Sequence, residues 1–421
     1  MYKKNTLKNG LRIITVPMKN TKAVTILVEV GTGSKYETKE INGLSHFLEH
    51  MLFKGTKKRP SSLEITETID RIGGINNAFT GKDSTGFWAK SDAKHLDLIL
   101  DWVSDIFLNS KLEEKEIKKE KGVIIEEMNM CLDTPISYIG DLWEKLIYGD
   151  QPAGWLIIGE KENILNFKRI DFLNYLKNHY SAKNTIICVA GNTTSEIAEE
   201  KIKKYFSNIN TQNPKAKLKV IEKQEKPQIL IHFKKTDQTH LHLGVRGYNL
   251  FHPQRFAQMI LATILGGFMS SRLFISIREK KGFAYYVSTV ADINADTGYL
   301  VTRAGVDNNK IEEVIKLILK EYQSLKNKKI EKSELKKAKE NLKGTLILSL
   351  ESSDSQASFY TDQELLTNKI LTPEEQFKRI DAVTIEDVKK VAKNIFKSEN
   401  LNLAVIGPFK DKEKFNKLLK I

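Results

Sequence analysis

The chain of 421 residues is 40% hydrophobic, 9% aromatic and 29% charged, which excludes a wholly disordered protein and allows two or more domains. The net charge of +14 comes mostly from lysines in helical runs interleaved with glutamate, so we expect solvated helix faces and no nucleic-acid partner. No segment has the roughly 18 continuous apolar residues of a membrane span, and no signal peptide is recognisable, so we expect a cytoplasmic protein. Cys131 and Cys188 lack the spacing of a disulfide framework and are expected to be reduced thiols.

The predicted elements occur in the same order in both halves of the chain. Each half begins with two strands around a polar turn, and continues with a helix and a glycine-marked pair of strands. Two long Lys/Glu-rich helices follow, and one more strand closes the half. The predicted strands of the first half lie within residues 11–30, 77–80, 85–90 and 184–192. Those of the second half lie within residues 228–246, 284–293, 298–304 and 400–408.

This repetition predicts an internal duplication, and the segment between the halves reads as a linker. The segment is polar and lysine-rich and contains Pro214 and Pro227. We therefore predict an N-terminal domain at 1–212, a linker at 213–227 and a homologous C-terminal domain at 228–421. The predicted fold class is α+β, with two homologous domains that are each a mostly antiparallel sheet covered by helices.

The sequence NGLSHFLEHMLFKG at residues 42–55 has helical periodicity and ends at a glycine. Within it, His46 and His50 are four residues apart, so both imidazoles project from one helix face and can reach the same metal ion. Glu49 lies beside that face, where it can reach a metal-bound water without binding the metal. The apolar neighbours indicate a largely buried helix, in which two histidines and a glutamate need partners. We therefore predict a metal site here.

A third ligand is predicted from a second helix. Ser110 and Glu113 have the spacing of a capping box that opens a helix running to about Leu132. Glu120 and Glu127 are seven residues apart and share one face of this helix. Glu127 is the favoured ligand, with Glu126 the less favoured choice. Glu120 would lie nearby as a carboxylate that orients a ligand or the water.

The set of His46, Glu49, His50, Glu120 and Glu127 resembles the inverted-zincin (HxxEH) peptidases, which include pitrilysin, insulin-degrading enzyme and the β subunit of mitochondrial processing peptidase. The resemblance covers essentially the whole chain and is closest to the bacterial processing-peptidase-like branch. It implies a zinc-dependent endopeptidase with one Zn²⁺ per chain, held by the N-terminal domain. The implied substrates are unfolded or extended peptides, enclosed in a chamber between domains. A chamber of four such domains further implies a homodimer, or a heterodimer with a homologous chain.

Two further segments carry this resemblance. Residues 73–90 resemble the family's edge strand, which binds substrate by strand addition, with Asn77, Ala78 and Phe79 at the matching positions; a plain hairpin would look the same. Residues 270–287 resemble the family's signature in the second domain, where Arg278 and Tyr285 match an arginine and a tyrosine that reach the substrate. The resemblance thus implies catalytic roles for Glu49, Glu120, Arg278 and Tyr285.

The second half has no HxxEH sequence. Ala338 and Thr345 stand where the first half has Glu120 and Glu127, so no metal is expected in the C-terminal domain. His240 and His242 share a strand face, and we interpret them as ordinary strand residues. The alternative function is a catalytically silent homologue that acts as a partner or scaffold subunit. Such homologues usually lose motif residues, and this chain has lost none.

Overall fold

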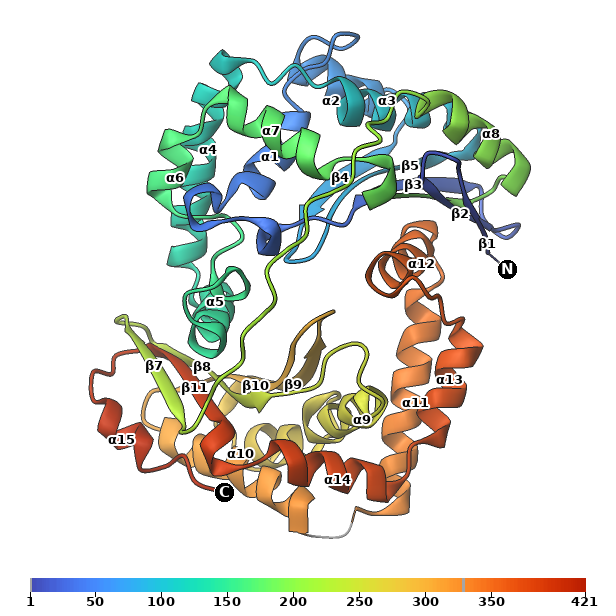
Figure 1. Ribbon diagram of the computed structural model, residues 1–421. Coiled ribbons are helices and arrows are strands. Elements are labelled where there is room, and N and C mark those ends of the chain that lie inside the picture. The colour runs from blue at the N-terminus through green and yellow to red at the C-terminus, as the bar shows by residue number, and fades with distance from the viewer. Residues whose placement is uncertain (1, 328–329) are drawn as a thin grey trace. The chain divides into compact units, whose positions relative to one another are not determined.

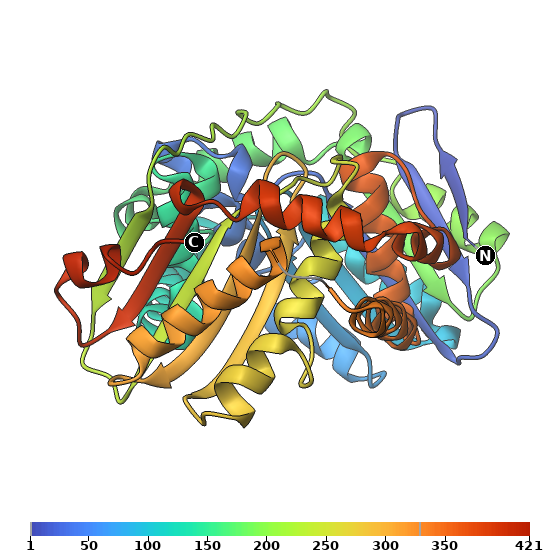
Figure 2. The ribbon, with the colours of Figure 1, turned by 90° about the horizontal axis from the view of Figure 1, so that it is seen from below.

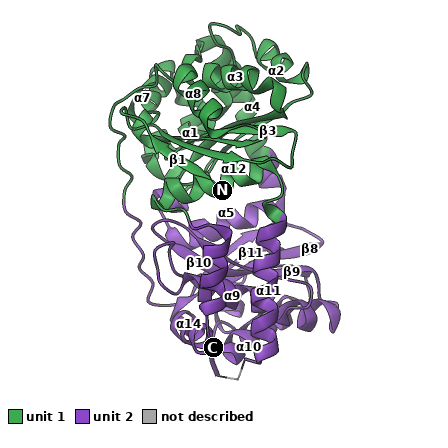
Figure 3. Ribbon diagram, turned by 90° about the vertical axis from the view of Figure 1, so that its right-hand side faces the viewer, with its two compact units in different colours: residues 1–129, 155–218, 349–370 green, residues 130–154, 219–348, 371–421 purple. Residues whose placement is uncertain are grey.

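The computed structural model describes residues 2–327 and 330–421 (Figure 1). The chain forms two compact units, each with one sheet and a set of helices (Figure 3). Unit 1 comprises Met1–Asn129, Trp155–Leu218 and Ser349–Ile370, and unit 2 comprises Met130–Gly154, Lys219–Leu348 and Leu371–Ile421. No helix in the described ranges is both long enough and apolar enough to cross a membrane.

The strands and helices of unit 1 begin and end as follows. Its strands are β1 (Lys3–Thr6), β2 (Arg12–Pro17), β3 (Ala23–Val30), β4 (Ile75–Thr80), β5 (Thr85–Asp92) and β6 (Thr185–Gly191). The helices that begin in unit 1 are α1 (Leu44–Leu52), α2 (Ser62–Asp70), α3 (Leu96–Asn109), α4 (Glu114–Asp133), α6 (Lys161–Asn166), α7 (Arg169–His179), α8 (Ser195–Tyr205) and α12 (Ser353–Thr367).

Unit 2 is built from a similar set. Its strands are β7 (Gln228–Phe233), β8 (Gln238–Arg246), β9 (Ala284–Ile293), β10 (Gly298–Asp307) and β11 (Leu401–Gly407). The helices that begin in it are α5 (Pro135–Tyr148), α9 (Arg255–Gly266), α10 (Ile311–Asn327), α11 (Lys332–Ser349), α13 (Pro373–Ala382), α14 (Ile385–Ile395) and α15 (Lys412–Asn416). Helices α9, α10 and α14 lie over one face of its sheet (Figure 2), and their apolar side chains share one core with that face.

Both sheets have the same strand topology, except that the first has β1 as an additional edge strand. The orders are β1-β2-β6-β3-β5-β4 and β7-β11-β8-β10-β9. The closing strand β6 lies between β2 and β3, and the closing strand β11 lies between β7 and β8; each is parallel to the first of its two neighbours and antiparallel to the second. All other pairings are antiparallel. The predicted α+β class is confirmed, and the repeated element order corresponds to a repeated topology.

Each unit also contains one helix from the other half of the sequence. Helix α12 packs against β2, β3 and β6 of unit 1, where its Ala357 and Tyr360 join the cluster formed by Ile14, Leu27 and Cys188. Helix α5 packs against β7, β8 and β11 of unit 2. The face of each sheet that lies under α12 or α5 is therefore covered by a helix from the other half of the sequence, so both halves are needed to bury these two faces. The predicted domain limits, 1–212 and 228–421, stay a prediction, and the predicted linker 213–227 contains no helix or strand.

The predicted capping box at the start of α4 is wrong. The hydroxyl of Ser110 donates instead to the carbonyl oxygen of Met51 at 3.2 Å. Leu112 has a φ of +50°, which interrupts helical geometry, so α4 begins at Glu114. The Ser110 side chain is therefore bonded to the end of α1 rather than to the first turn of α4.

Candidate metal centre

Helix α1 presents one polar face because its other faces are buried. Leu44, Phe47, Leu48, Met51 and Leu52 are at most 1% exposed, and the ring of Phe47 meets that of Phe172 edge-on at 4.9 Å. His46, Glu49 and His50 are only partly buried. The apolar pattern of the HxxEH sequence thus anchors the helix and leaves the two imidazoles and the carboxylate on its open face.

The N-terminus of α1 is held by Glu37, a residue that no motif in the sequence indicates. One oxygen of its carboxylate accepts from the backbone N–H of Gly43 at 2.9 Å and from the Asn42 side chain at 3.0 Å. The other oxygen accepts from the backbone N–H of Ser45 at 2.6 Å. Glu37 is 2% exposed, so it fixes the first turn of α1 from inside the core. A carboxylate that caps a helix from several residues upstream leaves no short-range sequence signal.

Burial raises the pKa of Glu37 to about 7, although the hydrogen bonds from Ser45, Gly43 and Asn42 oppose the rise. Because the pKa of Glu37 is higher in the folded than in the unfolded protein, the contribution of Glu37 to the unfolding free energy is fully present below about pH 4.5. This contribution is lost as the pH rises through 7. Relative to Glu37→Gln, the wild-type protein should lose about 2 kcal/mol of unfolding free energy between pH 5.5 and pH 8. Thermal unfolding of both proteins across this range measures the difference.

Glu40→Gln is the matched control for this prediction, because Glu40 is exposed on the same segment. Its melting temperature should follow that of the wild-type protein at every pH between 5.5 and 8. A constant difference between the wild-type protein and Glu37→Gln over this range would contradict the assigned pKa.

The side chains of His46, His50 and Glu127 meet between α1 and α4. The Nε2 atom of His46 lies 3.6 Å from one carboxylate oxygen of Glu127, and Nε2 of His50 lies 3.4 Å from the other. One ligand atom from each of the three residues lies within 4.8 Å of the others. Ligands about 2.0–2.2 Å from a tetrahedral zinc ion are roughly 3.3–3.6 Å apart. This donor set therefore fits Zn²⁺, whereas Glu126 is exposed on another face of α4.

Glu120 lies behind the histidine pair. It is 2% exposed, and its carboxylate bonds Nδ1 of His50 at 2.9 Å and the ammonium group of Lys54 at 2.7 Å. Burial by itself raises the pKa of Glu120, but the hydrogen bonds from His50 and Lys54 outweigh it and lower that pKa below its usual value. A carboxylate on Nδ1 fixes the ring so that Nε2 is the free ligand atom, as is typical of metal-binding histidines.

The edge strand β4 ends beside Glu49. The hydroxyl of Thr80, the last residue of β4, donates to the Glu49 carboxylate at 2.6 Å. β4 pairs only with β5, so its other edge is free within the described sheet. The side chains of Asn77 and Phe79 are exposed, while Ala78 packs against the core beneath the sheet. The structure thus places Asn77, Ala78 and Phe79 on a sheet edge that leads to Glu49.

Arg278 and Tyr285 lie together in unit 2. Arg278 is in the π-helical segment η6 (Phe274–Glu279), and Tyr285 is the second residue of β9. The turn between them includes Gly282 with a φ of +64°, and it returns the chain so that the Arg278 guanidinium is 5.8 Å from the Tyr285 ring. Tyr285 is 74% exposed. The two side chains therefore form one polar cluster at the edge strand β9, in which Tyr285 is exposed and Arg278 is partly buried.

The second half of the chain has no counterpart of the metal cluster. Within residues 2–327 and 330–421, His46, His50 and Glu127 are the one group of three or more possible metal ligands. Ala338 is fully buried in the core of unit 2, where a carboxylate would be costly. The difference between the two units is therefore chemical rather than topological.

Two different family models match successive segments of the chain. The family model "Insulinase (Peptidase family M16)" matches residues 12–154, and "Peptidase M16 inactive domain" matches residues 166–342. Two repeated α+β units, with an HxxEH helix in the first alone, define a class of zinc-peptidase-like proteins. The chain belongs to peptidase family M16.

Relatives and solved structures resemble the chain over almost its full length. "Uncharacterized zinc protease YmxG" from Bacillus subtilis (strain 168) is 38% identical over 97% of this chain and 98% of its own. A crystal structure of a protease from Helicobacter pylori is 27% identical, with a TM-score of 0.90 over 97% of this chain and 99% of that one. A chain of complex III2 from Candida albicans has a TM-score of 0.86 at 19% identity over 100% of both chains, a likeness of fold alone.

Proposed function

We propose that the protein is a zinc-dependent endopeptidase that hydrolyses peptide bonds in unfolded or extended peptides. The observation that carries the proposal is the convergence of His46, His50 and Glu127 in ligand geometry, with Glu49 beside them on the same helix face. Relatives named as zinc proteases support it. A catalytically silent homologue would have no need to keep this complete set.

The roles of the residues follow from their contacts. His46, His50 and Glu127 would hold Zn²⁺, and Glu120 would keep His50 oriented through Nδ1. When bound, zinc would polarise the peptide carbonyl and lower the pKa of a water toward about 7. Glu49 would accept the proton of the attacking water and deliver it to the leaving amine. The hydrogen bond from Thr80 keeps one Glu49 oxygen in place and leaves the other available.

The free edge of β4 supports an extended substrate. A peptide that adds to this edge satisfies the outward backbone groups of Asn77–Phe79 and runs toward Glu49. Asn77 accepts a hydrogen bond from the backbone N–H of Ala78 through its side chain at 2.9 Å, so a bound strand would replace that local contact. In a folded protein most backbone N–H and C=O groups are already paired, so a folded protein should be a poor substrate. The predicted chamber between domains and the predicted dimer stay predictions.

The test of this function is hydrolysis of a quenched fluorescent peptide library by the purified full-length chain. We expect cleavage of unstructured peptides, nearly complete loss of cleavage with a chelator, and recovery when Zn²⁺ is restored, because the ligand set cannot polarise a carbonyl without the ion. A stable folded protein in the same assay should stay intact. If activity is equal with and without metal, or absent from the zinc-loaded protein, the proposal fails.

We further propose that Tyr285, placed by Arg278, donates its hydroxyl to the oxyanion that develops on the substrate. Loss of one such donor costs about 10²–10³ in kcat. Tyr285→Phe should therefore lower kcat by about that factor and leave zinc content unchanged, which steady-state kinetics and metal analysis would show. Tyr2→Phe is the control, because Tyr2 packs against Tyr360 in unit 1 and should affect neither. Unchanged kcat in Tyr285→Phe would remove Tyr285 from the mechanism.

A further inference from the structure

A group of polar side chains occupies one face of the unit 2 sheet. It consists of His240 and His242 on β8, Tyr286 and Ser288 on β9, and Arg303 on β10. His242 is paired across the strands with Arg303, and Arg303 with Ser288. Leu241 and Leu243 of β8 alternate with the histidines and face the apolar core on the other side. The group therefore lies on the face that carries α5.

The neighbouring row of the sheet brings a hydroxyl into the same group. Gly305 stands between His240 and Tyr286 in the strand register. A Cβ atom on Gly305 would lie 2.4 Å from the Tyr286 ring, so the missing side chain lets this ring lie across β10. The Tyr286 hydroxyl then reaches Nδ1 of His240 at 3.0 Å. This arrangement holds the phenol beside Arg303.

The Arg303 guanidinium has no acidic partner. Among the residues that the structure describes, no carboxylate oxygen lies within 4.0 Å of it, and its shielded Nε has no hydrogen-bond partner. His242 is 4% exposed, and its buried Nδ1 also lacks a partner in that part of the chain. The negative charges of Asp292 and Glu144 act on Tyr299 of β10 and, together with that of Glu222, on Tyr148 of α5. Arg303 as a whole is only partly buried, so a guanidinium without an ion pair on the protein can bind an anion that approaches from solution.

The histidines do not add charge to the group. Burial, and then the charges of Arg303 and His240, lower the pKa of His242 to about 3, and burial lowers the pKa of His240. Burial raises the pKa of Tyr286 to about 12, although the charge of Arg303 opposes the rise. At neutral pH the group therefore has one positive charge, that of Arg303, surrounded by neutral hydrogen-bonding groups. The ring centroids of Trp143 on α5 and His242 are 6.3 Å apart.

We propose that Arg303, with Tyr286 and Ser288, binds a carboxylate of the peptide substrate. A guanidinium presents a planar fork of N–H donors that matches the two oxygens of a carboxylate, and the neighbouring hydroxyls add donors to the same anion. A peptide brings such a group either at its C-terminus or on an aspartate or glutamate side chain. The inference rests on the proposed peptidase function for the identity of the ligand. It adds a substrate-anchoring site that binds no metal.

The test measures peptide binding to the full-length Glu49→Gln chain, so that the probe is not consumed. The probes are three fluorescent forms of one short unstructured peptide: the free C-terminal acid, the C-terminal amide, and the amide with one glutamate near its end. The acid or the glutamate form should bind about 10-fold more tightly than the plain amide. Preference for the acid identifies the C-terminal carboxylate as the ligand, and preference for the glutamate form identifies a side chain.

Arg303→Gln should abolish this preference while leaving the affinity for the plain amide unchanged. Its melting temperature without peptide should be equal or higher, because an unpaired cation is removed. A structural role for Arg303 predicts the opposite shift. Tyr286→Phe, which keeps the ring, should reduce the preference and serves as the second variant.

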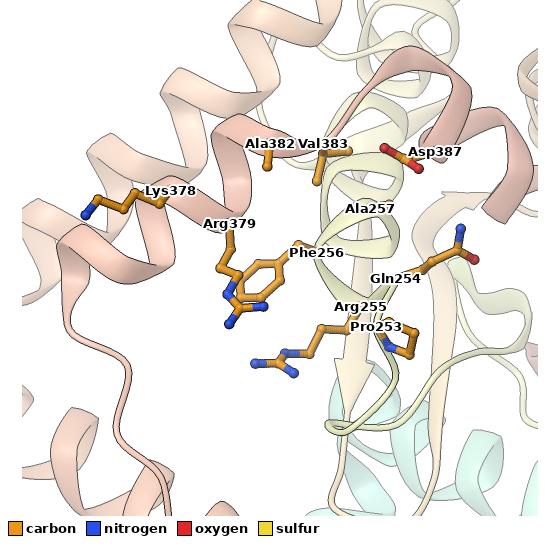
Figure 4. Close-up of a pocket in the computed structure, with 10 residues that line it drawn as sticks. All are labelled: Pro253, Gln254, Arg255, Phe256, Ala257, Lys378, Arg379, Ala382, Val383 and Asp387. Atoms are coloured by element: carbon orange, nitrogen blue, oxygen red, sulfur yellow. The ribbon is translucent and has the colours of Figure 1, made fainter.

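Arg379→Gln is the charge-matched control. Arg379 lines a surface pocket of about 470 Å³ with Arg255 and Phe256 on the α9 side of unit 2 (Figure 4). This variant should keep the full preference for a carboxylate. Two results would overturn the proposal. One is equal affinity of the Glu49→Gln chain, without further changes, for all three peptides. The other is loss of the preference in Arg379→Gln but not in Arg303→Gln. The two proposals can also fail separately. If the carboxylate preference depends on Arg303 but the zinc-loaded wild-type protein cleaves no peptide, only the peptidase function is refuted.

Discussion

Glu49→Gln should keep its zinc and lose most of its peptide hydrolysis. The amide has the shape of the carboxylate and can still accept the hydrogen bond from Thr80, so the end of β4 and the face of α1 should stay as they are. The three predicted ligands are unchanged, so metal content should remain near one ion per chain. The amide cannot accept the proton of the attacking water, and loss of such a base costs about 10²–10⁴ in kcat.

Peptide kinetics and elemental analysis on the same protein sample would measure both parts of this result. Glu126→Gln is the matched control, because Glu126 is an exposed glutamate next to the predicted ligand on α4. It should have wild-type activity and wild-type zinc. Near-normal hydrolysis by Glu49→Gln would refute the role of Glu49 as the proton acceptor, and a simultaneous loss of zinc would show that Glu49 acts on the metal instead.

His46→Ala, His50→Ala and Glu127→Ala should each lose the metal itself. Each change removes one of three predicted protein ligands, whose ligand atoms lie within 4.8 Å of one another. The remaining two ligands cannot make up the usual three-ligand catalytic site. We expect zinc content to fall from about one ion per chain to nearly none, with activity lost in proportion.

Thermal unfolding with added zinc provides a readout that is independent of activity. A ligand that binds only the folded protein raises its stability with concentration. The metal-depleted wild-type protein should therefore melt at a higher temperature as zinc is added, and the three ligand variants should not. Glu126→Ala should respond as the wild-type protein does. Full zinc binding by Glu127→Ala, together with its loss in Glu126→Ala, would reverse the choice between the two glutamates.

The sequence by itself predicted the features that depend on local spacing. Helical periodicity placed His46 and His50 on one face of a helix, and the seven-residue separation placed Glu120 and Glu127 on one face of another. The structure brings these two faces together, and three of the four side chains form the candidate metal site. The repeated order of strands and helices predicted two similar α+β domains, and the two sheets have the same topology apart from the additional edge strand β1.

Only the tertiary structure determined the contacts between residues far apart in the chain. Glu37 caps α1 through a loop that no helical or strand period describes. Ser110 has the local signal of a helix cap, but the carbonyl of Met51 binds its hydroxyl instead. Helices α5 and α12 each cover the sheet of the other half, because burying their apolar faces stabilises the fold whichever half supplies the helix. The pairing of Arg303 with His242 and Ser288 likewise depends on strand register, which long-range packing sets and which the local sequence alone does not specify.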